Sequence, residues 1–210
     1  MAKTGVTEPT AARPTRGEVT RQQLIDAAIE TLKDHGFGGA SARVIANRAG
    51  VNQGLIFYHF DSVTGLLLAA LDSVSATRRA RYGEAVDEVS SPAELVDVAS
   101  SIFREDLDAG HVAVLVAMIA GAASTPGLGE EVAKRIAPWT GFAREAVSGV
   151  LADSPLNSMV PADSVGFAIV ALYLGMEMLT QLDGDRAPAT ALFDHAMRLT
   201  ALLGAVGGAR

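Results

Sequence analysis

Apolar residues recur at intervals of three and four along most of this chain, which is the spacing of one face of an α-helix. In the first such stretch, Leu24, Ala28 and Leu32 follow one another at four-residue steps. Ahead of them, Thr15 and Glu18 have the spacing of a capping box, in which a hydroxyl and a carboxylate bind the free amides of the first turn. A helix is therefore predicted to begin at this box and to end before the next His-Gly pair.

The rest of the chain has the same helical periodicity, and no stretch alternates every second residue as a half-buried β-strand does. Pro138 predicts an interruption or a fresh start within one helix. The expected fold class is all-α, with about nine helices arranged as a three-helix helix-turn-helix head and a larger helical body. Outside the helix-turn-helix, helices are predicted at 15–34, 62–90, 92–109, 112–123, 128–152, 162–182 and 188–203.

The segment 41–60 has the anatomy of two helices that cross at a steep angle. Ser41 can cap the first helix with its hydroxyl. Ala46 is small where the second helix must approach, and Gly50 lies at the turn, where a positive φ is easiest without a Cβ. Ile56 attaches the second helix to the core. The segment is therefore predicted to be a helix-turn-helix that docks in the major groove of DNA.

Polar and aromatic side chains cover the outward face of the second predicted helix. Gln can pair in two places with adenine, apolar groups can touch the thymine methyl, and Tyr58 and His59 suit phosphate oxygens. Arg43 in the first helix can reach a guanine edge or the DNA backbone. Phe57 and Tyr58 could instead be core aromatics, but Ile56 and Phe60, one helical turn apart, already occupy the core side. The candidate DNA-binding residues are Ser41, Arg43, Asn52, Gln53, Gly54, Leu55, Phe57, Tyr58 and His59.

Residues 18–71 resemble the amino-terminal domain of the TetR family of transcriptional regulators. The resemblance is carried by a helix that ends in Gly-Phe, by RVIANRAGV in the first helix of the motif and by NQGLIFYHF in the second. It implies a homodimeric repressor that binds a palindromic operator in double-stranded DNA and leaves it when a small, largely apolar ligand binds. The residues at the family's base-contacting positions are Arg43, Gln53, Leu55 and Phe57, and those at its phosphate-contacting positions are Tyr58 and His59.

Two positions depart from the family pattern. Gln53 and Val63 stand where the family often has lysine. The loss of two cations should lower non-specific DNA affinity and flatten its salt dependence. Arg13 and Arg16, in and beside the amino-terminal segment 1–14, could compensate by reaching the DNA.

Three regions are predicted along the chain. Residues 1–14 are a disordered arm, 15–61 are the helix-turn-helix DNA-binding domain, and 62–210 are a ligand-binding and dimerisation domain. The family resemblance implies that the last two helices pair with their copies across a two-fold axis, and the small residues Ala171 and Gly175 agree with close helix contact. The candidate interface residues are Ala168, Ala171, Leu172, Gly175, Leu179, Leu192, Phe193, Ala196 and Leu199.

The resemblance also implies a small-molecule pocket between the other helices of the body. The side chains available for it favour an apolar or aromatic ligand with a few polar anchors. Each of them, taken singly, is more typical of ordinary core packing than of ligand contact. The candidate pocket residues are Phe103, His111, Leu115, Met118, Trp139, Phe142, Tyr173 and Met176.

Charge and composition refine this picture. Residues 1–60 carry 7 Lys/Arg against 5 Asp/Glu, whereas residues 61–210 carry 10 against 19, which suits a protein that meets phosphates at one end only. The absence of cysteine and of an apolar amino-terminal signal favours a cytoplasmic location. The apolar runs at 112–123 and 165–176 are shorter than the roughly 20 residues of a bilayer span. They are predicted to be buried helices, and no membrane association is expected.

An enzyme is the alternative class of function. No phosphate-binding glycine motif, metal-binding pair or nucleophile motif is recognisable, so no catalytic residue, cofactor or metal is predicted. Glu105, Asp108 and His111 have a spacing that could bind a metal, but this spacing is more typical of a solvated helix end. A regulator without a small-molecule effector is the second alternative. A repressor is preferred to an activator because most of the family are repressors.

Overall fold

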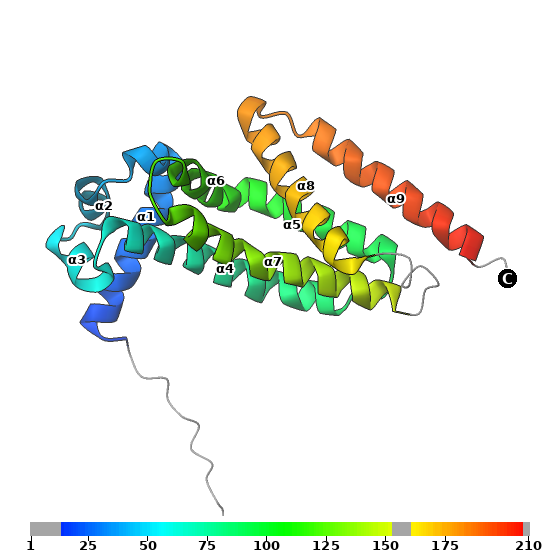
Figure 1. The fold of residues 1–210 in the computed structure, drawn as a ribbon, viewed down its shortest axis with the longest axis horizontal. Helices are drawn as coiled ribbons and strands as arrows, with labels where there is room; N and C mark the ends of the chain where they lie inside the picture. Colours follow the sequence, from blue (N-terminus) through cyan, green and yellow to red (C-terminus); the bar gives the residue numbers. More distant parts are fainter. Residues whose placement is uncertain (1–13, 153–160, 208–210) are drawn as a thin grey trace, which may run out of the picture.

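The described part of the molecule is all-α, as the sequence predicts (Figure 1). The structure is a computed structural model that describes residues 14–152 and 161–207. Nearly all of the predicted arm, at 1–13, lies outside these residues. Within them the chain forms nine α-helices and no strand. The helices are α1 (Arg16–Gly39), α2 (Ala42–Ala49), α3 (Gly54–Phe60), α4 (Val63–Asp87), α5 (Pro92–Ala109), α6 (His111–Ala122), α7 (Leu128–Leu151), α8 (Ala162–Asp183) and α9 (Ala187–Gly207).

Helix α1 begins at the predicted capping box. The Thr15 hydroxyl accepts a hydrogen bond from the Glu18 amide over 3.2 Å, and the Glu18 carboxylate accepts one from the Thr15 amide over 2.7 Å. Gly36 has φ +64°, which breaks the helical path where the sequence predicts its end, but a further turn follows as far as Gly39. In this turn Phe37 lies against Gly121 of α6, where a Cβ would come within 2.3 Å of the aromatic ring. The glycine therefore lets the two helices approach.

The head, which we define as residues 15–61, shares one continuous core with the body, residues 62–210. Leu24 of α1, Ile45 of α2 and Ile56 of α3 are fully buried together with Leu66 of α4 and Met118 of α6. In Figure 1 the helices of the head lie at one end of the molecule, and α4 runs from them along the body. Because protein cores are close-packed, a displacement of α4 or α6 is felt by the packing of the head.

In the body, α8 packs on α7 and α9 packs on α5. The predicted interruption at Pro138 is wrong, because α7 is one continuous helix through this residue. The proline removes a single amide donor, and the packing of α7 against its neighbours outweighs that loss. Close approach of α8 to α7 occurs at Gly166, where a Cβ would lie 2.9 Å from the backbone of Thr140 and Arg144.

Helix α8 presents much of its apolar surface to solvent, so the prediction of a buried helix at 165–176 is wrong. It has 22 residues and a mean hydropathy of 1.6 over its most apolar 18-residue window, of which 17% is buried. By length and composition alone it could cross a membrane, but it packs along α7 and has Glu177 and Thr180 on its buried side. Its exposed face is therefore an apolar surface that would be more stable if another apolar surface packed against it. The large residues on this face are Phe167, Ile169, Leu172, Met178, Leu179 and Leu182.

Candidate DNA interface and ligand cavity

The turn of the helix-turn-helix is built by local hydrogen bonds at the predicted positions. The Ser41 hydroxyl accepts from the Val44 amide over 3.4 Å at the start of α2. Gly50 ends α2 with φ +67°, a left-handed conformation that favours glycine. The Asn52 side chain accepts from the Gly54 amide over 2.8 Å and so caps the start of α3. These contacts set the direction of α3.

Helix α3 has a buried face and an outward face. Ile56 and Phe60 are buried in the core of the head, one helical turn apart. Between them, Phe57 is 50% exposed and Tyr58 is 79% exposed. The prediction that these two aromatics point away from the core is confirmed.

The predicted DNA-binding residues occupy the start of α2 and the length of α3. Leu55 and His59 are half-buried, and Leu55 packs against the core of the head. The imidazole of His59 also meets the Tyr58 ring edge-on, with 4.9 Å between ring centroids. These two side chains therefore have less surface to offer to DNA than their neighbours have. The exposed members of the set are Ser41, Arg43, Asn52, Gln53, Gly54, Phe57 and Tyr58.

Sequence reasoning missed one cation beside α3. Arg21 of α1 is exposed, and its guanidinium lies over the Phe60 ring, 5.1 Å from the centroid. Neither Arg21 nor Arg43 forms an ion pair with an acidic residue in the described ranges, whereas Arg48 is paired with Asp34. The sequence signal that could have suggested a role for Arg21 is its position one helical turn before the buried Ile25.

A cavity of about 300 Å³ lies in the body and is lined by residues of all six helices from α4 to α9. Its wall is apolar and aromatic, and Arg78 is the one charged side chain among the described residues that line it. This combination of an apolar wall with one polar group is typical of a small-molecule site. The predicted pocket residues on this wall are Leu115, Trp139, Phe142, Tyr173 and Met176.

The other three predicted pocket residues lie elsewhere. His111 lines a much smaller void of about 20 Å³ next to the cavity. Phe103 is buried between Tyr173 and Phe193, with ring centroids 5.6 and 5.4 Å away. Met118 is fully buried in the core that the head and body share, so it does not belong to the cavity wall.

The predicted dimer residues fall into two groups. Phe193 and Ala196 are half-buried on the cavity wall, so they face inward and not toward a partner. Gly175 is half-buried and has no neighbour within 4 Å of a Cβ position, so its side of α8 is open. Leu172 and Leu192 are both exposed and on the cavity wall. The exposed members of the set are Ala168, Ala171, Leu172, Leu179, Leu192 and Leu199.

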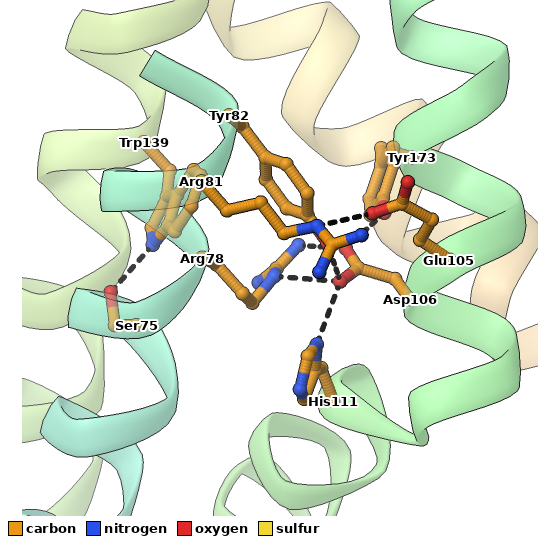
Figure 2. Close-up of polar contacts among 9 residues, drawn as sticks. All are labelled: Ser75, Arg78, Arg81, Tyr82, Glu105, Asp106, His111, Trp139 and Tyr173. Atoms are coloured by element: carbon orange, nitrogen blue, oxygen red, sulfur yellow. Dashed lines mark hydrogen bonds and ion pairs between the residues drawn. The ribbon is translucent and has the colours of Figure 1, made fainter. Parts of the chain in front are cut away.

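A buried polar cluster, unpredicted from the sequence, lies beside the cavity (Figure 2). Its centre is Asp106 of α5, which is fully buried. Arg78 donates to this carboxylate through Nε, over 3.0 Å, and through Nη2. The hydroxyls of Tyr82, over 2.7 Å, and of Tyr173 also donate to it, and His111 Nδ1 lies 3.1 Å away. One carboxylate therefore joins α4, α5, α6 and α8.

The environment of this cluster determines its charges. Burial raises the pKa of both Tyr82 and Tyr173 far above the usual value, and their bonds to Asp106 add to the effect, so both phenols stay neutral. Burial opposes the charge of Arg78, but the Asp106 carboxylate holds its pKa above the usual value. Arg78 is therefore a permanent cation in a site that water hardly reaches.

Glu177 of α8 is the second acid of this region. It is fully buried, and neither carboxylate oxygen has a hydrogen-bond partner among the described residues. Burial raises the pKa of Glu177 to about 7, and the nearby negative charge of Asp106 acts in the same direction. The sequence signal that could have found the cluster is a polar residue on an apolar face, such as Arg78 four residues after Val74.

The spacing of Glu105, Asp108 and His111 does not gather these side chains. Glu105 pairs with Arg81, Asp108 pairs with Arg186, and His111 contacts Asp106. Among the described residues no group of three or more His, Cys, Asp or Glu side chains is placed to hold a metal ion.

A small helix-turn-helix head shares its core with a larger body of long helices, and the body contains an apolar cavity. The family model described as "Bacterial regulatory proteins, tetR family" matches residues 24–70, which run from α1 into α4. The match includes the whole helix-turn-helix.

Relatives in sequence are similar over part of the chain. A Mycobacterium tuberculosis protein, named an uncharacterized HTH-type transcriptional regulator, is 32% identical over 116 residues, which are 55% of this chain and 59% of that protein. The Escherichia coli HTH-type transcriptional regulator BetI is 38% identical over 61 residues, which are 29% of this chain and 31% of BetI. The chain thus spans less than two thirds of the length of these relatives.

Solved structures are similar over almost the whole fold. A TetR-family transcriptional regulator from Cytophaga hutchinsonii has a TM-score of 0.75 at 18% identity, over 90% of this chain and 97% of that one. The transcriptional regulator FadR from Bacillus subtilis, solved in complex with stearoyl-CoA, has a TM-score of 0.72 at 16% identity, over 85% and 96%. The head is thus similar in sequence to the amino-terminal domain of the TetR family, and the fold is similar to that of solved TetR-family structures.

Proposed function

We propose that this chain is a DNA-binding transcriptional regulator of the cytoplasm, whose head docks α3 in the major groove. The observation that carries the proposal is the pair of exposed aromatics Phe57 and Tyr58 on α3, held outward by the buried Ile56 and Phe60. Exposed apolar groups on a fixed helix are typical of a surface that binds a partner. The helix-turn-helix geometry supports DNA as that partner.

The proposed roles follow from the exposure of each side chain. The side chains that contact base edges are Gln53, Phe57 and Arg43, because all three are exposed. Of these, Gln53 can pair with adenine. Tyr58 contacts the phosphate backbone, with His59 held against its ring. Val63, at a position where the family often has lysine, is half-buried against the core and offers the DNA no charge.

We further propose that the regulator is a homodimer on a palindromic operator. The open apolar face of α8 supports this, because Leu179 is 66% exposed and Leu182 is 82% exposed. A surface of this kind needs a cover, and a second copy of the same helix is self-complementary across a two-fold axis. Two heads related in this way would meet two half-sites about one turn of DNA apart.

The cavity supports a ligand-responsive repressor. FadR from B. subtilis, which has a similar fold, was solved in complex with stearoyl-CoA. We propose that a small, largely apolar ligand binds between α4 and α9 here, and that it displaces α4. Because α4 begins beside α3 and packs in the core of the head, its displacement would change how the two heads fit their half-sites and release the DNA.

Selection of binding sites from random double-stranded DNA tests the proposal. The purified protein is expected to enrich a palindromic sequence and to retain it in a gel shift at physiological salt. The matched control is the double variant Gln53→Ala/Phe57→Ala, which keeps the buried face of α3 and should retain no specific sequence. Failure of the wild-type protein to enrich any sequence would contradict the proposal.

A further inference from the structure

The charged group on the cavity wall identifies the kind of ligand that the proposed regulator takes. The cavity is lined by apolar side chains from six helices, and among the described lining residues only Arg78 carries a charge. A ligand of this cavity must therefore bury an apolar body. It must also satisfy, or at least tolerate, one guanidinium.

Other polar atoms on the wall are already engaged within the chain. Trp139 Nε1 donates to the Ser75 hydroxyl over 2.9 Å, and the Tyr173 hydroxyl donates to Asp106. Figure 2 shows Trp139 turned toward Ser75. Neither group has an unused donor, so Arg78 supplies the free donors on the wall.

Arg78 keeps donors that the chain does not use. A guanidinium has five N–H groups, and Asp106 accepts from Nε and Nη2. Nη1 has no hydrogen bond to any described residue, and the Arg78 side chain lies on the cavity wall. The guanidinium is also held over the Trp139 ring, 4.6 Å from the centroid, so its orientation is restricted.

We propose that the cavity binds an acidic amphiphile, a molecule with an apolar body and a single carboxylate, and that the carboxylate binds the unused Nη1 edge of Arg78. This inference rests on the proposed ligand-responsive function and names the chemistry of the ligand. Arg binds carboxylates through paired N–H donors, and such bonds are stronger where water is excluded. The ligand acid would join Asp106 as a second carboxylate on the same cation.

A cationic ligand does not fit the same wall. Its charge would lie beside the Arg78 guanidinium. The Asp106 carboxylate, which is bound to Arg78, already receives bonds from Arg78, Tyr82 and Tyr173. Glu177 is the other buried acid, but it is not on the cavity wall.

The test compares head groups on fixed apolar bodies. Two series are titrated by calorimetry into the full-length protein: decanoate, decan-1-ol and decylamine, and then 2-naphthoate, 2-naphthol and 2-naphthylmethylamine. In at least one series the acid is expected to bind about tenfold or more tightly than the alcohol and the amine, the size of a charge-assisted hydrogen bond. Equal or tighter binding of the alcohol or amine in both series, or no binding at all, overturns the proposal.

A balanced pair of substitutions assigns the preference to Arg78. Because loss of Arg78 alone would leave Asp106 charged and unpaired, the variant is Arg78→Gln/Asp106→Asn. It should lose the preference for the acid while it still binds the alcohol. Arg81→Gln/Glu105→Gln is the matched control, since it removes an exposed ion pair between the same two helices (Figure 2) and should keep the preference.

The outcomes separate this proposal from the proposed function. An acid preference that survives in Arg78→Gln/Asp106→Asn, with circular dichroism showing a folded variant, overturns the role of Arg78. If the balanced variant does not fold, Arg78→Lys provides the second test, because it keeps the charge but loses the guanidinium edge and should weaken acid binding by about tenfold. If no probe binds but the protein still selects its DNA site, the ligand inference fails and the DNA-binding function stands.

Discussion

Three residues of the head set the direction of α3 and therefore the position of its exposed face. Gly50 takes a left-handed turn, Asn52 caps α3, and Ile56 anchors α3 in the core, so the direction of the helix follows from three local interactions. The side chains between the anchors then have no freedom to turn inward. Phe57 and Tyr58 are exposed for this reason, although both are aromatic.

Phe57→Ala is expected to weaken binding to the selected operator by about tenfold or more, because an apolar contact with a base edge is lost. Stability should change by less than about 0.5 kcal/mol, since the side chain is half exposed. Fluorescence anisotropy with operator and with scrambled DNA measures the first effect, and urea denaturation measures the second. Ile119→Ala, at an exposed apolar residue of α6, is the control and should leave the DNA affinity unchanged. Equal loss in both variants would argue against a DNA contact at Phe57.

At the scale of the elements, close packing is set by a few small or polar residues. Gly166 lets α8 approach the backbone of α7, and Asp106 ties α4, α5, α6 and α8 together. A buried ion pair such as Arg78–Asp106 contributes little net stability, but the removal of one partner is costly. The cluster links four helices through one carboxylate, so loss of a single partner would leave a buried charge unpaired.

Gly166→Ala should destabilise the protein by about 1–3 kcal/mol, because the added Cβ would lie 2.9 Å from backbone atoms that cannot rotate away. The free energy of unfolding in urea measures this effect. Gly149→Ala is the matched control: it lies in α7, is exposed and has no neighbour within 4 Å of the Cβ position. Alanine favours the helix there, so the control should be neutral or stabilising. A neutral result at Gly166 would mean that α8 does not pack on α7 as described.

Glu177 makes the stability of the protein depend on pH. Its pKa of about 7 in the folded chain stands above its ordinary value of 4.5, so the folded state binds the proton more tightly than the unfolded state. Stability is therefore lost as the pH rises from about 4.5 to 7 and changes little above 7. The pKa of Glu177 is also influenced by the ionisable groups around it. These are Asp106 of α5, Tyr173 of α8, Arg78 of α4 and Arg186, which follows α8.

Between pH 5 and pH 8 the wild-type protein should lose about 2–3 kcal/mol relative to Glu177→Gln, which cannot ionise. Urea denaturation at the two values measures the difference. Glu145→Gln, at an exposed acid of α7, should follow the wild-type protein. Parallel pH dependence of the wild-type protein and Glu177→Gln would show that Glu177 ionises normally.

In the molecule as a whole, the exposed apolar face of α8 is not covered by any other described helix of the same chain. The helix is apolar on its exposed side, and in one copy its cover is incomplete. Dimerisation would bury this face and would also close over Leu172 and Leu192, which lie at the edge of the cavity. The proposed interface and the proposed ligand site are therefore neighbours.

Leu179→Glu should raise the dissociation constant of the dimer by about 100-fold, because a carboxylate without a partner would be buried in an apolar interface. Sedimentation equilibrium at micromolar concentration measures the mass, and circular dichroism checks that the fold is kept. Val19→Glu, at an exposed apolar residue of α1, should remain a dimer. A monomeric wild-type protein, or a Leu179→Glu variant that still dimerises, would remove the basis for the two-fold arrangement.

Amino-acid order alone determined the local features of this protein. Caps at Thr15, Ser41 and Ser62 act on amides only three residues away, so helix starts and the helix-turn-helix could be predicted from neighbours in sequence. The exposure of Phe57 and Tyr58 followed from the same helical period. The approximate positions of the body helices were predicted for the same reason.

Features that depend on contacts between residues far apart in the sequence came from the packing of the helices. Asp106 receives bonds from positions 78, 82 and 173, and the cavity takes its wall from six helices. Helical periodicity shows which face of α8 is apolar, but it does not show whether that face meets the core or solvent. The continuity of α7 through Pro138 likewise depends on packing. Long-range contacts of this kind are set by how the helices pack together, and no local pattern reports them.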